Sequence, residues 1–333
     1  MNDFKQRVRW FIRDAVLSPL MLPGVSSLCR RLATKSAVIS YHNILSQSFD
    51  GSQLIHNVDI AEEAFEKQLR FLKKNYRVQP ASNILNCHDS DGVFLSFDDG
   101  MLNNYEVVAP LLKKFGMTAV FAICPDLANR KIPFLWRDWL YLGIARCFET
   151  GQGLPSDHRR QPSDTSESFF RRLCPQMFNE PDPYQAISTW FPNPQELENG
   201  NRMNPSRFHP MSWEHISKLR DAGHVIASHA MTHRPLNNLT DSEIEDELAG
   251  SKRELEKNTG QKCALLVYPY GTHPLVGDRA IQLAKECHYE LAFMNVRGES
   301  NDSFSLPRFG LPNTSRRTRL TASMTGLLAW FKG

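Results

Sequence analysis

The sequence lacks the features that mark several large classes of protein. Its seven cysteines are scattered and odd in number, and no two of them form a CxxC pair. This argues against a disulfide framework and a thiolate zinc site, and favours reduced thiols in a cytoplasmic protein. No apolar run approaches the roughly 20 residues that a membrane-spanning helix needs. The 39 basic and 36 acidic residues leave a net charge of only +3, which is too balanced to indicate a nucleic-acid partner.

What the sequence does contain is an alternation of strand and helix patterns over 333 residues. A chain of this length can form one large α/β domain or two ordinary ones. Amphipathic segments that we expect to be helical lie between short apolar runs, and the first of them follows Asp59, a candidate cap. This order is typical of a parallel sheet. We expect strands at 37–41, 93–97, 119–123, 224–227, 264–268 and 290–293, and helices at 61–75, 105–115, 212–223, 242–259 and 277–287.

Three segments stand outside this alternation. Residues 1–35 combine apolar residues at helical spacing with basic ones, which fits either a helix on an anionic membrane surface or a helix docked on the protein itself. They lack the clean apolar stretch of a secretory signal. Residues 129–210 predict a partly helical insertion, which is either a lid with substrate contacts or a solvated excursion. Residues 320–331 form a short apolar helix candidate beside arginines.

Two adjacent carboxylates, Asp98 and Asp99, follow the apolar run Val93 to Phe97. Two like charges at the end of a buried strand repel each other, and burying even one is costly unless a cation or hydrogen-bond donors compensate. A metal ion supplies that compensation, because one carboxylate can bind it while the other remains free as a base. The simpler alternative is an Asp-Gly turn after a core strand.

His229 and His233 form the second candidate group, because they follow another expected strand. If this segment is helical, residues four apart project from one face and both rings can reach a single ion. Taken alone, such a pair is more often two surface histidines. In parallel α/β folds, however, the carboxyl ends of the strands converge on one site. Two imidazoles and one carboxylate leave a coordination position open for water, which is typical of a catalytic metal.

These motifs resemble those of a known family. The segments Phe94–Gly100, His229–His233 and Tyr268–Gly271, in that order, are similar to the first three motifs of the polysaccharide deacetylases (the NodB-homology, carbohydrate esterase 4 group). The resemblance covers roughly residues 36–312 apart from the insertion. Tyr41-His42 and residues 58–65 further resemble the branch of poly-N-acetylglucosamine deacetylases.

The resemblance implies a distorted (β/α) barrel that binds one divalent metal, usually Zn²⁺. Its metal ligands would be Asp99, His229 and His233, and Asp98 would be the general base. The metal would polarise the acetamide carbonyl and activate water. The segment Pro269-Tyr270 would bind substrate, with the Tyr270 backbone N–H facing the oxyanion.

The sequence also departs from the family pattern. Ala230 stands where the second motif usually has Ser or Thr, and Ser96 replaces the usual Thr. Val267 occupies the position of an arginine that orients the base, so Arg308 is our candidate for that role. No late Leu-x-His motif is evident, and the general acid must come from elsewhere.

We assign the general acid to His42. An amine leaving group needs a proton, and an imidazole supplies one near neutral pH. His42 follows an apolar strand, as the other candidate residues do. The alternatives are that His42 is only structural, and that His273 provides the acid.

The sequence therefore predicts a metal-dependent hydrolase that removes an N-acetyl group from an amino sugar. The substrate would be a polysaccharide or a lipid-linked glycan precursor, and the amphipathic ends indicate peripheral contact with the inner face of a membrane. Two alternatives remain: a deformylase of a lipid-linked amino sugar, and a catalytically silent glycan-binding protein. The full set of ligands and the base argue against the silent protein, because a binding module has no use for a base.

Overall fold

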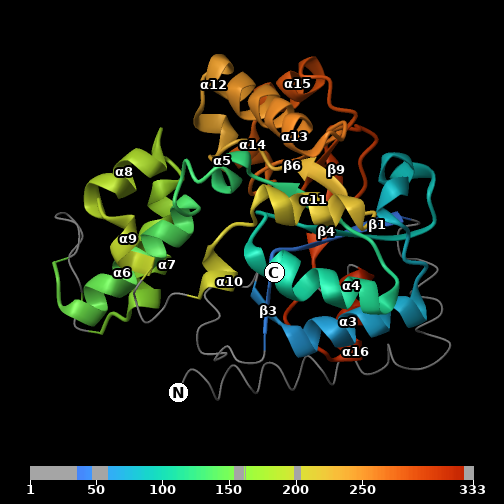
Figure 1. Cartoon of the computed structure of the whole chain (residues 1–333), viewed down its shortest axis with the longest axis horizontal. Coiled ribbons are helices and arrows are strands. Elements are labelled where there is room, and N and C mark those ends of the chain that lie inside the picture. Colours follow the sequence, from blue (N-terminus) through green and yellow to red (C-terminus); the bar gives the residue numbers. More distant parts are fainter. Residues whose placement is uncertain (1–35, 47–58, 154–160, 162, 199–203, 326–333) are drawn as a thin grey trace.

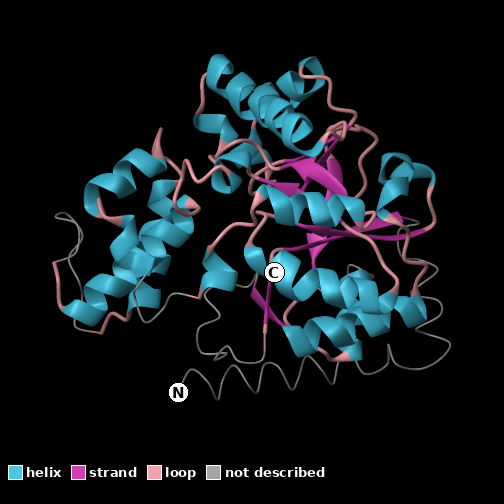
Figure 2. Cartoon of the chain, viewed as in Figure 1, coloured by secondary structure: helices cyan, strands magenta, loops and turns pink. Residues whose placement is uncertain are grey.

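The computed structural model describes residues 36–46, 59–153, 161, 163–198 and 204–325. Its centre is a closed barrel of parallel strands in the order β1-β4-β5-β6-β7-β8-β9, and β1 pairs with both β4 and β9 to close it. The predicted (β/α) barrel is confirmed (Figures 1 and 2). The barrel strands are β1 (Ser36–Tyr41), β4 (Gly92–Phe97), β5 (Val120–Ile123), β6 (Val225–Ser228), β7 (Leu265–Val267), β8 (Leu291–Met294) and β9 (Leu306–Gly310).

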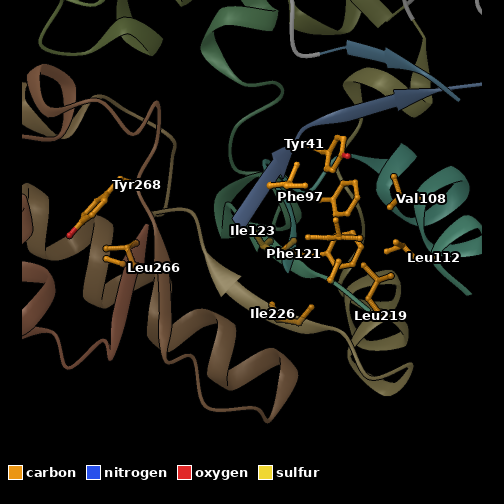
Figure 3. Packing of buried hydrophobic residues seen from close by; sticks show 14 of the residues in the cluster. Tyr41, Phe97, Val108, Leu112, Phe121, Ile123, Leu219, Ile226, Leu266 and Tyr268 are labelled. Atoms are coloured by element: carbon orange, nitrogen blue, oxygen red, sulfur yellow. The ribbon is translucent and has the colours of Figure 1, made fainter. Parts of the chain in front are cut away.

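Side chains alternate between two cores because successive residues of a strand face opposite sides of the sheet. In β4, Phe94 belongs to a cluster inside the barrel with residues of six other strands, whereas Leu95 and Phe97 belong to the cluster beneath the outer helices. Figure 3 shows this outer cluster, in which Tyr41, Phe97 and Phe121 lie opposite Val108 and Leu112. Neighbouring rings of these three aromatic residues stack with centroids 5.2 Å apart.

Helices cover the outside of the barrel, and local signals explain their ends. Ser212 accepts a hydrogen bond from the His215 backbone N–H and caps α11. Gly116 ends α4 with a left-handed φ of 67°. The helices that follow barrel strands or flank them are α3 (Glu62–Asn75), η3 (Ala81–Asp89), η4 (Asn104–Val108), α4 (Ala109–Phe115), α11 (Trp213–Asp221), η5 (Leu236–Asn238), α12 (Asp241–Glu245), η6 (Asp246–Gly250), α13 (Ser251–Thr259), α14 (His273–Val276), α15 (Asp278–Glu286) and α16 (Arg317–Met324).

The segment between β5 and α11 forms a mainly helical lobe beside the barrel (Figure 1). The lobe has a hydrophobic core of its own, which includes Trp136, Phe169 and Ile187. The segment is therefore partly packed structure, and not simply a solvated excursion. Its helices are α5 (Pro125–Ala128), α6 (Trp136–Thr150), α7 (Ser166–Met177), α8 (Pro183–Trp190), α9 (Pro194–Glu198) and α10 (Pro205–Phe208).

One local prediction is wrong and another is confirmed. Asp59 does not cap α3, whose first turn has no side-chain cap; it lies in the short strand β3 (Asp59–Ala61), which pairs with β2 (Asn43–Leu45). The helix expected at 242–259 is confirmed: it spans residues 241–259, begins after a capping box at Thr240, and contains a π-helical turn.

The structure describes only part of the two terminal segments that the sequence predicts to be amphipathic helices. The basic segment 1–35 lies outside the described residues, as do residues 326–333. The described part of the C-terminal helix, α16, packs Leu320 and Met324 into the outer core of the barrel. Among the described helices, none is both long and apolar enough to span a membrane.

Candidate active site

Most of the candidate residues follow the carboxyl ends of barrel strands. His42 comes after β1, Asp98 and Asp99 after β4, and His229 after β6. Arg308 lies within β9, on the same side of the strand as the inward-facing Leu306. Parallel strands bring these positions to one end of the barrel.

Asp98 is buried and held from two sides. Its two carboxylate oxygens accept hydrogen bonds from the two terminal nitrogens of Arg308, both at 2.6 Å. The His42 Nε2 atom lies 3.5 Å from Asp98 Oδ2. Burial by itself raises the pKa of Asp98, but the charge of Arg308, with smaller contributions from His229 and His42, holds it below its ordinary value. Asp98 is therefore a carboxylate at neutral pH, the form that a general base requires.

His42 is anchored through its backbone. Its carbonyl accepts a hydrogen bond of 2.8 Å from the side-chain amide of Asn104 at the start of η4. The next residue, Asn43, bonds Asn103 in the same helical segment at 2.7 Å. The His42 side chain is 22% exposed, whereas that of Asp98 is 1% exposed. Of the two, His42 is thus the residue that is open to solvent.

Asp99, His229 and His233 form a second group beside Asp98. The Nε2 atoms of the two histidines lie 3.5 and 3.4 Å from Asp99 Oδ1, and one potential ligand atom from each residue falls within 4.8 Å of the others. All three residues are buried. The arrangement presents one oxygen and two nitrogens to a common point.

The other ring nitrogen of each histidine has a fixed partner. His229 Nδ1 lies 2.6 Å from the Val267 carbonyl oxygen, an acceptor, so Nδ1 carries the proton. His233 Nδ1 lies 3.1 Å from the Tyr270 hydroxyl, which in turn donates to the His233 carbonyl. Both Nε2 atoms therefore keep a free lone pair toward Asp99. Such outer contacts orient histidines that bind metals.

These residues fit a divalent metal. Among the described residues Asp99 Oδ1 has no hydrogen-bond partner although it is buried, and a buried acceptor of this kind needs a cation or a donor. Ligands of one tetrahedral zinc ion lie about 3.3–3.6 Å apart, close to the separations seen here. Burial lowers the pKa of His233 to about 3, so its imidazole is neutral at physiological pH and free to bind a metal.

The histidine segment is a loop and not a helix. After β6 the chain takes a left-handed φ at Ala230 (57°) and at His233 (65°). Asp99 (74°) and Tyr270 (61°) share this rare conformation, and only Arg130 and His288 do so among the other described residues that are not glycine. Backbone strain of this kind concentrates at functional sites.

Tyr270 and Pro269 lie next to the metal-site candidates. The Tyr270 ring packs 4.6 Å from the His233 ring, centroid to centroid, and Pro269 is buried. The Tyr270 backbone N–H forms no hydrogen bond with the described residues, so it is available as a donor.

The sequence analysis did not identify two residues that contact the histidine loop. Glu247 accepts hydrogen bonds from the loop, and Tyr184 of the lobe donates to the Thr232 carbonyl at 2.6 Å. Neither residue belongs to a motif.

Comparison with known families supports this reading. The sequence profile described as "Polysaccharide deacetylase" matches residues 164–292, which include both candidate histidines and Tyr270 but not Asp98 and Asp99. The resemblance to the polysaccharide deacetylase family is confirmed. The matched segment spans less than half of the chain and carries two of the three candidate metal ligands. A comparison with curated proteins found no match.

Solved structures of deacetylases share the fold. The Streptococcus pyogenes deacetylase PplD in complex with acetate is 16% identical, with a TM-score of 0.54, over 84% of this chain and 94% of its own. A polysaccharide deacetylase from Bacillus cereus is 19% identical, with a TM-score of 0.53, over 88% of this chain and 69% of its own. IcaB from Ammonifex degensii is 16% identical, with a TM-score of 0.53, over 90% of this chain and 99% of its own.

Proposed function

We propose that this chain is a metal-dependent polysaccharide deacetylase, which removes N-acetyl groups from amino sugars of a glycan. The observation that carries the proposal is the placement of the Arg308-held carboxylate of Asp98 directly beside the cluster of Asp99, His229 and His233. A base next to three candidate ligands is the arrangement that a hydrolase with an activated water requires. A catalytically silent binding protein needs neither group.

The three ligands would hold one divalent ion. Zinc suits this set of two imidazole nitrogens and one carboxylate oxygen. When bound, the ion supplies Lewis-acid polarisation of the acetamide carbonyl and lowers the pKa of a water molecule.

The chain's own residues supply the proton transfers. Asp98 takes a proton from water as the water oxygen forms a bond to the carbonyl carbon, and Arg308 keeps the carboxylate in place. The Tyr270 N–H donates to the carbonyl oxygen as negative charge develops there. His42 gives its proton to the amide nitrogen as the carbon–nitrogen bond breaks. The products are acetate and a free amine on the sugar.

The family profile favours a polysaccharide as the substrate, and we take this as the first candidate. A lipid-linked glycan precursor, with an acetyl or a formyl group, is the alternative. The two differ in what lies beyond the reacting sugar and not in the chemistry at the amide.

The test is release of acetate from N-acetylated oligosaccharides and from lipid-linked N-acetylglucosamine, with zinc and with a chelator. Asp98→Asn and His42→Ala should each lower kcat by about 10²–10⁴-fold, because each removes one proton transfer. Both variants should retain bound metal, since neither residue is a proposed ligand. Asp91→Asn, at an exposed position before β4, is the matched control and should be fully active.

Three results would contradict the proposal. The first is acetate release that is unaffected by the chelator. The second is stoichiometric metal in a His229→Ala/His233→Ala double variant. The third is a His42→Ala enzyme with normal kcat and an unchanged pH profile, which would remove His42 as the acid; His273, exposed at the start of α14, would then be tested.

A further inference from the structure

The loop that carries both candidate histidine ligands has an unusual backbone. Ala230 and His233 adopt left-handed φ values of 57° and 65°, which cost free energy for residues with a Cβ atom. The loop therefore needs contacts that hold it in this shape. Met231 and Thr232, between the two positions, turn their backbone N–H groups toward one carboxylate.

That carboxylate belongs to Glu247 in η6. Its Oε2 atom accepts hydrogen bonds from the backbone N–H groups of Met231 at 2.8 Å and Thr232 at 2.9 Å. Its Oε1 atom accepts one from the Thr232 hydroxyl and one from Arg234 Nε at 3.2 Å. Glu247 is only 2% exposed. Two consecutive N–H groups that converge on a carboxylate form an anion-binding nest.

We propose that Glu247 is a positioning residue that fixes His229 and His233 in the geometry that binds the metal. This inference rests on the proposed function, because it takes the two histidines as ligands. Each ring already has an outer partner, in Val267 and Tyr270 respectively. Glu247 does not contact the rings; it holds the backbone of Met231 and Thr232, which lie between the two histidines.

The sequence explains why this chain needs such a residue. Ala230 stands where the family motif usually has a hydroxyl side chain, so the loop lacks that hydrogen bond from within. The Thr232 hydroxyl and the carboxylate of Glu247 supply contacts to the loop from a different position. Glu247 is also buried without a role in the proton transfers, and a buried carboxylate is retained only where its hydrogen bonds compensate for its desolvation.

The experiment measures the Zn²⁺ dissociation constant by competition with a chromophoric chelator, for the wild type and for Glu247→Gln. The amide keeps the size of the side chain but can no longer offer two acceptor oxygens. We expect Zn²⁺ binding to weaken by about 10–100-fold, which is the usual effect of removing an outer contact of metal ligands. The visible spectrum of the Co²⁺ form should shift as well, since it reports on ligand geometry and not on stability. Glu247→Asp should recover only part of the affinity, because it keeps the charge on a shorter side chain.

Glu245→Gln is the matched control. Glu245 lies directly before η6 and is exposed, and its replacement by Gln removes the same charge as Glu247→Gln does. Its Zn²⁺ affinity and Co²⁺ spectrum should equal those of the wild type.

A second variant covers the case in which Glu247→Gln does not fold. Thr232→Val removes only the hydroxyl contact to Glu247, and a several-fold weaker affinity with a shifted Co²⁺ spectrum is expected. Wild-type affinity and an unchanged spectrum in the folded variants would overturn the role of Glu247 and leave the proposed function intact. Failure of the wild type itself to bind any metal would instead overturn the metal site.

Discussion

Asp98 and Asp99 show how two adjacent carboxylates can share a site without repelling each other out of it. The left-handed φ of 74° at Asp99 turns the chain sharply after β4. Asp98 then faces the guanidinium of Arg308 inside the barrel, and Asp99 faces the two histidines. Each negative charge has a different compensating partner, so the pair can carry two roles.

His224 offers a test of acid sensitivity away from the site. Burial lowers its pKa from 6.5 to about 4. Its Nδ1 atom accepts a hydrogen bond of 3.1 Å from the Ala119 backbone N–H, which requires an unprotonated nitrogen. As the pH falls below about 6.5, His224 binds a proton in the unfolded chain but stays neutral in the folded protein. His224 should therefore lower the free energy of unfolding by about 2 kcal/mol between pH 7 and pH 5.

Urea unfolding at both pH values measures this loss. His224→Asn is the comparison, because its side-chain oxygen can accept the same hydrogen bond but does not titrate. The loss on going from pH 7 to pH 5 should be smaller in His224→Asn by that amount, since all other groups titrate equally in both proteins. Equal losses in the two proteins would exclude the prediction.

The sequence could predict those parts of the fold and site that depend on neighbouring residues. Apolar runs located six of the seven barrel strands, all but β9, and strand ends located most of the candidate site. Contacts between residues far apart in the sequence could not be predicted. Asp59 has the position of a helix cap, yet it pairs with Arg207 from the end of the lobe. The left-handed turns at Ala230 and His233 were also not predictable, because a positive φ is uncommon for any residue other than glycine. Glu247 looked like one more charge on an amphipathic helix.

The helical lobe is attached to the barrel near the candidate site. Tyr184 of α8 donates to the Thr232 carbonyl in the histidine loop, and the Phe178 ring lies 4.9 Å from the Tyr270 ring. Asn238 of η5 bonds the Phe178 carbonyl at 2.6 Å. These contacts make the lobe a support for the loop. Substrate contacts by the lobe, one of the two alternatives for residues 129–210, stay a prediction.

A buried ion cluster joins the end of the lobe to its beginning and to the barrel. Arg207 of α10 reaches Asp138 of α6 with two hydrogen bonds of 3.1 Å and Asp59 of β3 at 3.0 Å. All three side chains are at most 5% exposed. Burial raises the pKa of Asp138 even beside this arginine, so the cluster depends on the charge of Arg207.

Replacing Arg207 should therefore be severe. Arg207→Met removes the cation that both buried carboxylates contact and should lower the free energy of unfolding by about 3–5 kcal/mol. Urea denaturation followed by tryptophan fluorescence measures this. The triple variant Arg207→Met/Asp59→Asn/Asp138→Asn should be more stable than Arg207→Met alone, since it removes the uncompensated charges.

Arg70→Met is the control. Arg70 pairs with Glu66 on the surface of α3 and its side chain is 62% exposed, so its loss should cost less than about 1 kcal/mol. A similar small cost for Arg207→Met would mean that the cluster does not hold the lobe in place.

For the molecule as a whole, the remaining question is where it works. From the scattered cysteines and the amphipathic ends of the sequence, we propose a cytoplasmic enzyme at the inner face of a membrane. The described part of the C-terminal helix is docked on the barrel through Leu320 and Met324. We therefore propose that membrane contact is made by residues 1–30, where Lys5, Arg7, Arg9 and Arg13 lie among apolar residues at helical spacing.

We predict that the full chain floats with vesicles that contain anionic lipid, and not with neutral ones. Each basic residue near an anionic surface contributes about 1 kcal/mol, so replacing Lys5, Arg7, Arg9 and Arg13 by Gln should weaken partitioning by about 10³-fold. High salt should release the wild type, because the attraction is screened within a Debye length. The control replaces as many exposed lysines on the barrel, namely Lys113, Lys218, Lys257 and Lys262, and should still float. If the wild type remains in the soluble fraction at low salt, residues 1–30 do not bring the enzyme to a membrane. A lipid-linked precursor would then lose its main support as the substrate.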